Sequence, residues 1–371
     1  MKMEMKIEVV ILLFLIFTGC SKINTYKKTE ENIVRNSNKN AKKSNLNEEF
    51  EYFNRGLIKH FSGDIVGATR DYDQTIKLDP KFKYAYDTRG ISKGSLEDFE
   101  SAIKDFDKAV ELDPKFTYAY NNRGFTKTKL RDFESAIEDF DKAIELSPNF
   151  KLAYFNRGNT KYFTENYRGA IDDYSKVVKL DPKYKLAYNN RGLAKGDLGD
   201  YKGAIEDFDK AIELDSNLKL AYNNRGFAKS KLRDFEGSIE DYNKTIELDP
   251  NFKLAYINRG VTKVEIEDYH GAIEDYSKAI ELDSDFRVAY YRRGLAKNKL
   301  RDYRGAIKDY DKTLKLNPNF KLAYYNRGLA KTKLGDFEGA VKDFHKTIEL
   351  DPNDKEAKEM YKKFQFIIEK K

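Results

Sequence analysis

Cysteine and histidine are scarce in this chain of 371 residues, and their scarcity narrows its possible chemistry. Cys20 is the single cysteine, so the chain cannot form an internal disulfide. The histidines His60, His270 and His345 are widely separated, and the sequence contains no GxSxG, HExxH, GxGxxG or P-loop pattern. We therefore expect no catalytic activity, no bound metal and no cofactor.

Long apolar runs are also missing, apart from a short one near the N-terminus. Residues 9–17 read VVILLFLIF, and a helix needs about 20 such residues to cross a bilayer. The run fits the hydrophobic region of a secretory signal peptide, and it is followed by Thr18, Gly19 and Cys20. Small residues directly before the only cysteine resemble the lipobox of bacterial lipoproteins.

This resemblance implies that residues 1–19 are a signal peptide and that Cys20 becomes a lipid-modified N-terminus. Several acyl chains would hold the protein stably on a membrane, because each buried CH₂ contributes about 0.8 kcal/mol. The protein would then be anchored to the cell membrane or outer membrane and face the periplasm or the outside. An uncleaved signal anchor is the alternative. Residues 21–48 are rich in Asn, Lys and Ser, so we expect residues 20–48 to form a flexible tether.

An excess of charge of one sign is absent from most of the chain. The formal charge is +7, of which residues 21–48 carry +4 and residues 355–371 carry +3. The residues between these two segments are neutral overall. Because a nucleic-acid channel needs a continuous basic track, we expect no nucleic-acid partner. The basic ends are either solvated tails or contacts for anionic lipid.

What the chain does contain is a strict repeat of 34 residues. An Arg-Gly pair recurs nine times at this spacing, with no insertion or deletion. Such a period is typical of a solenoid array, in which each unit buries its apolar face against its neighbours. The nine arginines are Arg55, Arg89, Arg123, Arg157, Arg191, Arg225, Arg259, Arg293 and Arg327.

The fifth copy, residues 185–218, shows how one unit is organised. Apolar residues recur at helical spacing over residues 186–198, Gly199 interrupts the pattern, and Asp200 is a suitable N-cap for a second helix. Over residues 201–214 apolar residues fall three and four apart, which predicts one apolar face on that second helix. All seven prolines of the chain occupy one repeat position just after it, where proline prevents the helix from continuing.

This unit resembles the tetratricopeptide repeat. The residues that carry the resemblance are aromatic or small, and in the fifth copy they are Tyr188, Gly192, Tyr201, Ala204, Phe208 and Ala211. The resemblance implies an all-α fold, a right-handed superhelical solenoid of nine helix-turn-helix repeats over residues 49–354. Residues 355–371 are predicted to form a further helix that caps the ninth repeat.

Two residues of the first helix depart from the common pattern of that family. Arg191 and Lys195 stand where the family commonly has leucine and tyrosine, and both recur in all nine copies, as does Asp207 of the second helix. Arg191 and Lys195 are four residues apart and therefore share a helix face. We expect Asp207 to bridge Arg191 and Lys195 in an ion-pair ladder between the two helices. The alternative is a basic stripe offered to a ligand.

The family resemblance also implies that the first helix of each repeat lines a concave groove. Seven copies place an asparagine on that groove, and Thr88 and Arg292 interrupt the series. An amide can donate and accept, so it can bind the backbone of a peptide, although such residues also tolerate a simply solvated position. The asparagines are Asn54, Asn122, Asn156, Asn190, Asn224, Asn258 and Asn326.

The residue before each of these positions is expected to face the groove as well. This set varies between copies and comprises Phe53, Asp87, Asn121, Phe155, Asn189, Asn223, Ile257, Tyr291 and Tyr325. Tyr162 and Phe163 in the fourth copy are expected to add an apolar anchor, unless they pack on adjacent turns. The eighth repeat, residues 287–320, carries +7 and the seventh, residues 253–286, carries −4. Arg292 and its neighbours are therefore expected to receive an acidic segment or a phosphate-bearing glycan, unless the two repeats compensate each other.

These observations predict a monomeric, membrane-anchored scaffold of the bacterial cell envelope. Its groove would bind a protein or peptide partner, and the protein would serve as an assembly or stabilising factor. Two alternatives remain open at the level of sequence. One is a lipoprotein that binds glycan or peptidoglycan fragments, and the other is a passive structural spacer.

Overall fold

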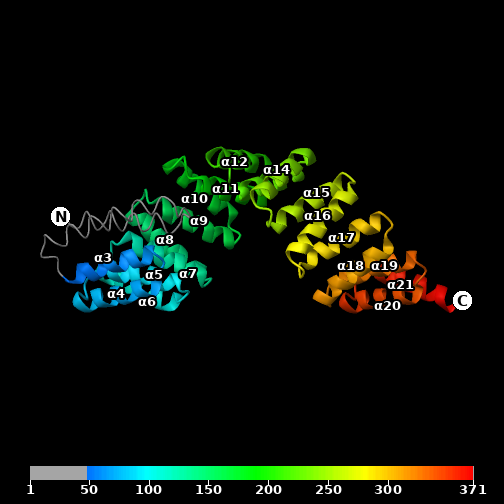
Figure 1. Cartoon of the computed structure of the whole chain (residues 1–371), viewed down its shortest axis with the longest axis horizontal. Helices are drawn as coiled ribbons and strands as arrows, with labels where there is room; N and C mark the ends of the chain where they lie inside the picture. The colour runs from blue at the N-terminus through cyan, green and yellow to red at the C-terminus, as the bar shows by residue number, and fades with distance from the viewer. Residues whose placement is uncertain (1–47, 371) are drawn as a thin grey trace. The chain divides into compact units, whose positions relative to one another are not determined.

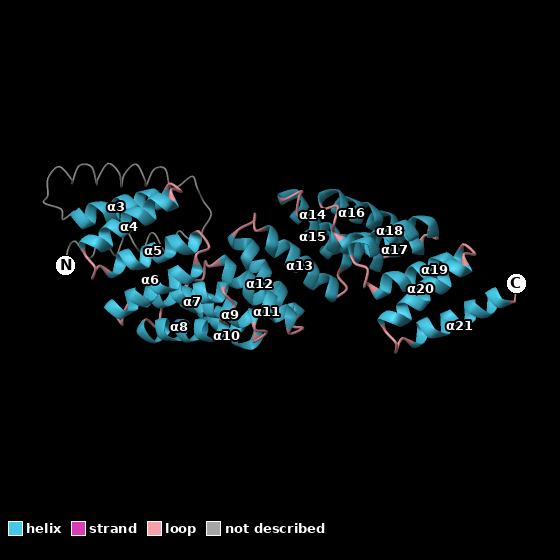
Figure 2. Cartoon of the chain, turned by 90° about the horizontal axis from the view of Figure 1, so that it is seen from below, coloured by secondary structure: helices cyan, strands magenta, loops and turns pink. Residues whose placement is uncertain are grey.

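The computed structural model describes residues 48–370, which form nineteen helices and no strand (Figures 1 and 2). The signal segment, Cys20 and the tether up to residue 47 lie outside the described residues. The helices up to the fourth repeat are α3 Glu48–Phe61, α4 Ile65–Leu78, α5 Lys83–Ser95, α6 Phe99–Leu112, α7 Thr117–Lys129, α8 Phe133–Leu146, α9 Lys151–Phe163 and α10 Tyr167–Leu180. The remaining helices are α11 Lys185–Asp197, α12 Tyr201–Leu214, α13 Lys219–Lys231, α14 Phe235–Leu248, α15 Lys253–Glu265, α16 Tyr269–Leu282, α17 Arg287–Lys299, α18 Tyr303–Leu316, α19 Lys321–Lys333, α20 Phe337–Leu350 and α21 Lys355–Glu369.

Each 34-residue unit forms one pair of helices, which we call helix A and helix B in chain order. The all-α, helix-turn-helix prediction is therefore confirmed. None of the described helices is long and apolar enough to serve as a membrane span. Contacts divide the helices into two compact units, with the division inside α9 between Thr160 and Lys161.

The turn between helix A and helix B is fixed by two residues. The first has a positive φ, which is 84° at Gly199 and 66° at Arg233. The second is the predicted N-cap, and the Asp200 carboxylate accepts a hydrogen bond from the Gly203 amide at 3.0 Å. Because a side chain that bonds this amide satisfies a donor with no partner inside the helix, the cap sets where helix B begins.

Small residues let helix A and helix B of one repeat approach closely. Ala204 and Ala211 of α12 are fully buried. A Cβ built on Gly192 of α11 would lie 2.7 Å from Cε1 of Phe208, so no other residue fits there without displacing the ring. The rings of helix B therefore lie directly against the backbone of helix A. The same close approach recurs at Gly56, Gly90, Gly124, Gly226, Gly260, Gly294 and Gly328.

Within each of the two compact units, a helix contacts mainly the helices next to it in the chain. Helix A of one repeat also makes a smaller contact with helix A of the next repeat. The last helix, α21, covers α20 in the same way. The Phe364 ring stacks on Phe337 and Phe344, with centroid separations of 5.4 and 6.1 Å. The core is thus a series of thin layers between successive helices, and no single centre holds the structure together.

Candidate functional site

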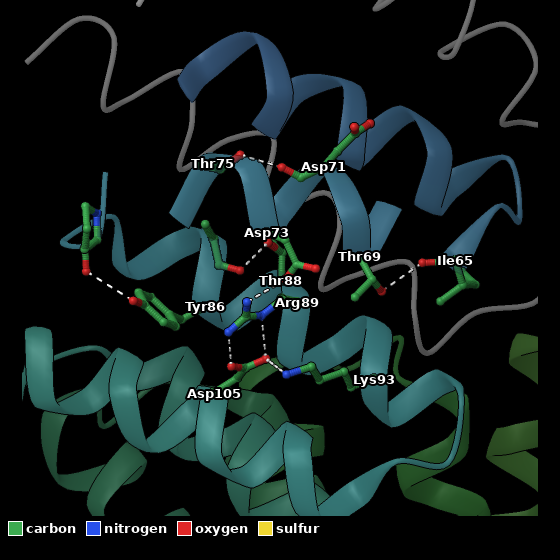
Figure 3. Close-up of polar contacts among 12 residues, drawn as sticks. Ile65, Thr69, Asp71, Asp73, Thr75, Tyr86, Thr88, Arg89, Lys93 and Asp105 are labelled. Atoms are coloured by element: carbon green, nitrogen blue, oxygen red, sulfur yellow. Dashed lines mark hydrogen bonds and ion pairs between the residues drawn. The ribbon is translucent and has the colours of Figure 1, made fainter. Parts of the chain in front are cut away.

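The recurring arginine of helix A joins the two helices of its own repeat. In the fifth repeat, Nε and Nη2 of Arg191 donate to the two carboxylate oxygens of Asp207 at 2.9 and 2.6 Å. Lys195 Nζ lies 2.8 Å from the same carboxylate. Figure 3 shows the equivalent cluster of Arg89, Lys93 and Asp105. The side chain of Asp207 is 5% exposed, whereas those of Arg191 and Lys195 are 17% and 21% exposed.

The same arginine also reaches back to helix B of the preceding repeat. Arg191 Nη1 donates to Ser175 at 3.1 Å, and Arg225 makes the equivalent contact with Asp209 at 2.6 Å. The guanidinium of Arg191 lies 5.5 Å from the ring centre of Tyr188, one turn earlier in α11. Hydrogen bonding to Asp207 raises the pKa of Arg191, against the opposing effect of burial. Arg191 therefore contacts residues of its own helix and of the B helices before and after it.

The predicted groove asparagines form a second series of contacts, between the A helices of successive repeats. Asn224 donates its amide to the Oδ1 of Asn189 at 3.2 Å, and Asn258 donates to Asn223 at 3.1 Å. We call the position of Asn224 and its equivalents the donor position, and the position of Asn189 and its equivalents the acceptor position. In the other unit Asn122 and Asn156 donate to Asp87 and Asn121, and near the C-terminus Asn326 donates to the hydroxyl of Tyr291.

The expectation that the acceptor position faces the groove is wrong. Six of its nine residues are buried, and these are Phe53, Asp87, Asn121, Asn189, Asn223 and Ile257. Residues at this position lie one helical step, about 100°, from the donor position. They therefore point into the layer between successive A helices, and the donor residue stands at the edge of that layer.

Where the acceptor position is apolar, a tyrosine of helix B can supply the polar partner. Phe155 occupies the acceptor position of the fourth repeat, and Asn190 of the fifth repeat hydrogen-bonds the hydroxyl of Tyr174. Burial raises the pKa of Tyr174, so this hydroxyl stays neutral. The donor asparagines are thus half-buried and already bonded within the chain, except that Asn54 of the first repeat is exposed. Their predicted role as peptide-binding residues stays a prediction.

Apart from Phe163, several exposed apolar side chains of the A helices were not singled out from the sequence. They lie at the second residue of helix A and seven residues later, so they share one helix face. Leu254 is 48% exposed, and Phe227 is 46% exposed with Lys231 Nζ 5.1 Å from its ring centre. We call this surface in the C-terminal unit the A-helix face, and its most exposed apolar residues are Leu220, Phe227, Leu254 and Leu322. The signal was a recurring leucine at the start of helix A.

The predicted apolar anchor of the fourth repeat is only partly available. Tyr162 donates its hydroxyl to Asp197 at 2.5 Å and packs on Tyr167 with ring centres 5.4 Å apart. Phe163 is 64% exposed at the end of α9. Phe155 is half-buried. Of these predicted residues, Phe163 alone offers a largely accessible ring.

Arg292 of the eighth repeat occupies the donor position. Ile257 at the facing acceptor position offers it no polar atom, and it hydrogen-bonds the hydroxyl of Tyr276 in helix B, as Asn190 does with Tyr174. Its Nε atom is buried and has no hydrogen-bond partner among residues 48–370. The residues described by the structure also contain no group of three or more His, Cys, Asp or Glu side chains that could hold a metal.

Comparison with known proteins follows the period of the chain. Sequence profiles described as tetratricopeptide repeat match residues 117–150, 186–218, 220–252, 288–320 and 322–354, and a second profile with the same description matches residues 84–116, 152–184 and 254–286. No curated protein sequence matches the chain.

Solved structures give similar arrays. The chain in "Crystal structure of APC/C hetero-tetramer Cut9-Hcn1" is 15% identical, with a TM-score of 0.52, and the match covers 85% of this chain and 76% of that one. YrrB, described as a TPR protein with an unusual peptide-binding site, is 26% identical with a TM-score of 0.43, covering 50% and 95%. MamA is 30% identical with a TM-score of 0.43, covering 45% and 92%.

Proposed function

We propose that this chain, which belongs to the tetratricopeptide repeat family of scaffolds for protein–protein interaction, binds a segment of a partner protein on its A-helix face. We also propose that a lipid at Cys20 holds the protein at a membrane of the cell envelope. The observation that carries the binding proposal is the exposed apolar surface of the A helices. Leu220, Leu254 and Leu322 recur there at the same repeat position, where soluble helices usually carry polar residues.

The rest of the chain supports this choice of face. The arginine of every helix A is engaged by aspartate, and the donor asparagines of the later repeats are bonded within the array. These polar seams hold the helices in place, and the apolar side chains of the A-helix face are left to contact a partner. Burial of large apolar side chains is the main source of affinity in such interfaces.

The proposed anchor rests on the sequence around Cys20. A short apolar run, small residues and a single cysteine occur in the order that a lipoprotein signal requires. The roughly thirty polar residues between Cys20 and the first repeat would place the array away from the membrane surface, at a distance limited by their number. We propose that the protein acts there as an assembly or stabilising factor.

Photo-crosslinking in intact cells tests the binding face. A benzophenone amino acid at position 254 replaces an exposed leucine of helix A, and the same group at position 202 replaces the exposed Lys202 of helix B as a matched control. We expect a discrete protein adduct from position 254 and none from position 202. Equal labelling from both positions, or adducts only from position 202, would contradict the proposed face.

Lipid attachment is tested separately. The wild-type chain should carry acyl groups at Cys20 by mass spectrometry and should fractionate with membranes. The Cys20→Ser variant should lose both properties while its array stays folded, because Cys20 lies outside the repeats. A wild-type chain with unmodified Cys20 would refute the anchor and leave the binding face untouched.

A further inference from the structure

The side of α18 opposite to its buried residues carries a line of cations. Arg304, Lys308, Lys312 and Lys315 follow one another at steps of four, four and three residues. At about 100° per residue these side chains lie within about 80° of one another, and the line they form is about 16 Å long. Lys312 is half-buried and the other three are exposed. We call these four residues the basic stripe.

No other repeat of the sequence is basic at all four positions of the stripe. Glutamate is the commonest residue at the positions of Lys308 and Lys315. In α16 the glutamate equivalent to Lys315 is Glu281, which lies 2.8 Å from Lys278, and the same pair recurs in α6, α8, α12, α14 and α20. Because Lys315 replaces this glutamate, Lys312 has no acidic partner on its own helix.

The basic stripe has almost no ion pairs inside the array. Lys312 Nζ lies 3.7 Å from a carboxylate oxygen of Asp285, whose side chain is 77% exposed. Within residues 48–370 no ion pair involves the other three cations of the stripe. By contrast, Arg293 and Lys297 of the same repeat share the buried Asp309. The excess charge of this repeat is therefore exposed on the stripe and not held between its two helices.

The helix beside the stripe carries the opposite charge. Arg293 donates to Ser277 of α16 at 3.0 Å and to Asp309 of α18 at 2.9 Å, so these two B helices flank the same guanidinium. The outer side of α16 exposes Glu274 and Glu281. A flat anionic surface such as a lipid bilayer would meet these carboxylates together with the stripe and be repelled by them. The stripe therefore fits a narrow, linear anion that lies along α18.

Charge is the main attraction that the stripe offers. No large apolar side chain is exposed between residues 267 and 321, whereas segments of proteins gain most of their affinity from buried apolar and aromatic side chains. On α18 itself Tyr303 is half-buried and Tyr310 is buried, so no exposed ring could stack with a nucleic-acid base. A densely charged chain needs neither contact, because it binds by releasing its counterions.

We propose that the basic stripe binds a linear polymer that carries a phosphate group in each unit of its backbone and has no bases. The guanidinium of Arg304 can hold a phosphate through two parallel hydrogen bonds, and each lysine adds a point charge one turn further along the helix. The stripe lies on helix B, whereas the proposed face for a partner protein lies on the A helices. The inference thus goes beyond the proposed function and does not depend on it.

Two double variants separate the stripe from the net charge of the chain. Lys308→Glu with Lys315→Glu is the stripe variant, which introduces the residue that is commonest at both positions and gives Lys312 the partner that its equivalents have. Lys104→Glu with Lys179→Glu is the control variant. It makes the same change of charge at the same two repeat positions, on exposed residues of α6 and α10. Equal helix content by circular dichroism checks that both variants are folded.

The test measures binding of the full chain to dye-labelled inorganic polyphosphate and to dye-labelled oligoglutamate of the same charge, by fluorescence anisotropy. Wild type should bind polyphosphate more tightly than oligoglutamate. The stripe variant should bind polyphosphate roughly ten- to a hundredfold more weakly. Its log Kd should also depend less steeply on log salt concentration, by about 1.4, which corresponds to two lost phosphate contacts at about 0.7 each. The control variant should bind polyphosphate as wild type does.

Other outcomes would overturn the proposal for distinct reasons. Oligoglutamate binding as tight as polyphosphate binding would indicate that the stripe receives an acidic protein segment. Equal weakening in the control variant would show an effect of net charge alone. Unchanged polyphosphate binding in the stripe variant, or no binding by wild type, would mean that the stripe is only a solvated helix face.

Discussion

The pKa of a buried carboxylate in this array shifts up or down, depending on whether the arginine and lysine of helix A lie beside it. Burial raises the pKa of Asp71, but hydrogen bonds from Arg55 and Lys59 outweigh that effect, so its pKa is lowered overall. Asp87 has no such cation, and burial raises its pKa to about 7. A carboxylate inside these thin layers is thus stable as an anion only where the arginine and lysine of helix A accompany it.

Replacing Asp207 by alanine should reveal the strength of this ion-pair cluster. The change leaves Arg191 and Lys195 partly buried without their carboxylate, and breaking a buried pair in this way costs about 3–5 kcal/mol. We expect about 2–4 kcal/mol from urea unfolding, because both cations keep some access to water. Asp209→Ala is the matched control, since Asp209 pairs with Arg225 but its side chain is 54% exposed. That variant should lose about 0–1 kcal/mol, and equal losses would contradict a buried cluster.

Asp87→Asn should stabilise the protein at alkaline pH. The folded-state pKa of about 7 lies above the unfolded value near 3.9. The stability that its proton provides is therefore complete below pH 4 and is lost as the pH rises to 7. Asparagine keeps the bond from Asn122 without this loss, so we expect a gain of about 2–4 kcal/mol at pH 8 and none at pH 3.5. The reverse change, Asn121→Asp, should destabilise at pH 8, and a gain there would sink the argument.

His60 should produce a pH dependence of the opposite sign. Burial lowers its pKa to about 4, below the unfolded value near 6.5. The unfolded chain then takes up a proton first, so stability falls as the pH drops from 6.5 to 4, by up to about 3 kcal/mol. His60→Thr should flatten this slope in hydrogen exchange of α5, because Thr128 already bonds Thr160 at the equivalent position. His345→Thr, at a histidine that is 56% exposed, should leave the slope unchanged.

At the scale of the helix pair, two glycines of α11 have opposite roles although they are four residues apart. Gly192 faces the ring of Phe208, and Gly196 has ordinary room, with the nearest atom 4.0 Å from a built Cβ. Close packing requires the first glycine, whereas the second only increases the conformational freedom of the unfolded chain. This difference explains why all nine copies have glycine at the first position, whereas only Gly94 and Gly196 are glycine at the second.

Gly192→Ala and Gly196→Ala should therefore change stability in opposite directions. The first places a methyl group 2.7 Å from Phe208, and overpacking of this kind costs about 1–3 kcal/mol. The second should gain about 0.5–1 kcal/mol from helix propensity. The check is the urea midpoint of each variant against wild type. A gain in Gly192→Ala would mean that the ring moves aside freely.

The helix pairs were predictable because their signals are local. Proline, an N-cap aspartate and the apolar period fix where each helix begins and ends, whatever surrounds it. The rotation of helix A was not predictable, because its residues contact helices from two different repeats. The acceptor position was therefore assigned to the groove and is buried. The contact from Arg191 to Ser175 was also not predicted, although Ser175 and Asp207 lie sixteen residues before and after Arg191.

At the scale of the whole molecule, stability is a sum over neighbouring layers. Within each of the two compact units the helices contact mainly their neighbours in the chain, so a weakened layer should open without unfolding distant ones. The end of the array illustrates this, because α21 is the last layer and stacks Phe364 on two rings of α20.

Phe364→Ala should therefore act locally. We expect faster hydrogen exchange in α20, corresponding to a loss of about 1–3 kcal/mol there, and no change in α11. Phe366→Ala is the matched control on the same helix, since Phe366 is 56% exposed and should leave α20 unchanged. Uniformly faster exchange along the array would contradict a layered structure and indicate one cooperative core.

The variation between donor and acceptor positions bears on how nine near-identical units find their correct neighbours. The ion-pair cluster repeats almost unchanged, so it cannot tell one repeat from another during folding. Amide meets amide between Asn224 and Asn189, whereas Arg292 follows Ile257. A helix that docked on the wrong neighbour would bury an amide against an apolar side chain, at a cost in an unmet hydrogen bond wherever helix B lacks the tyrosine that serves Asn190. These few variable contacts thus favour the correct neighbour for each repeat and disfavour misregistered assembly.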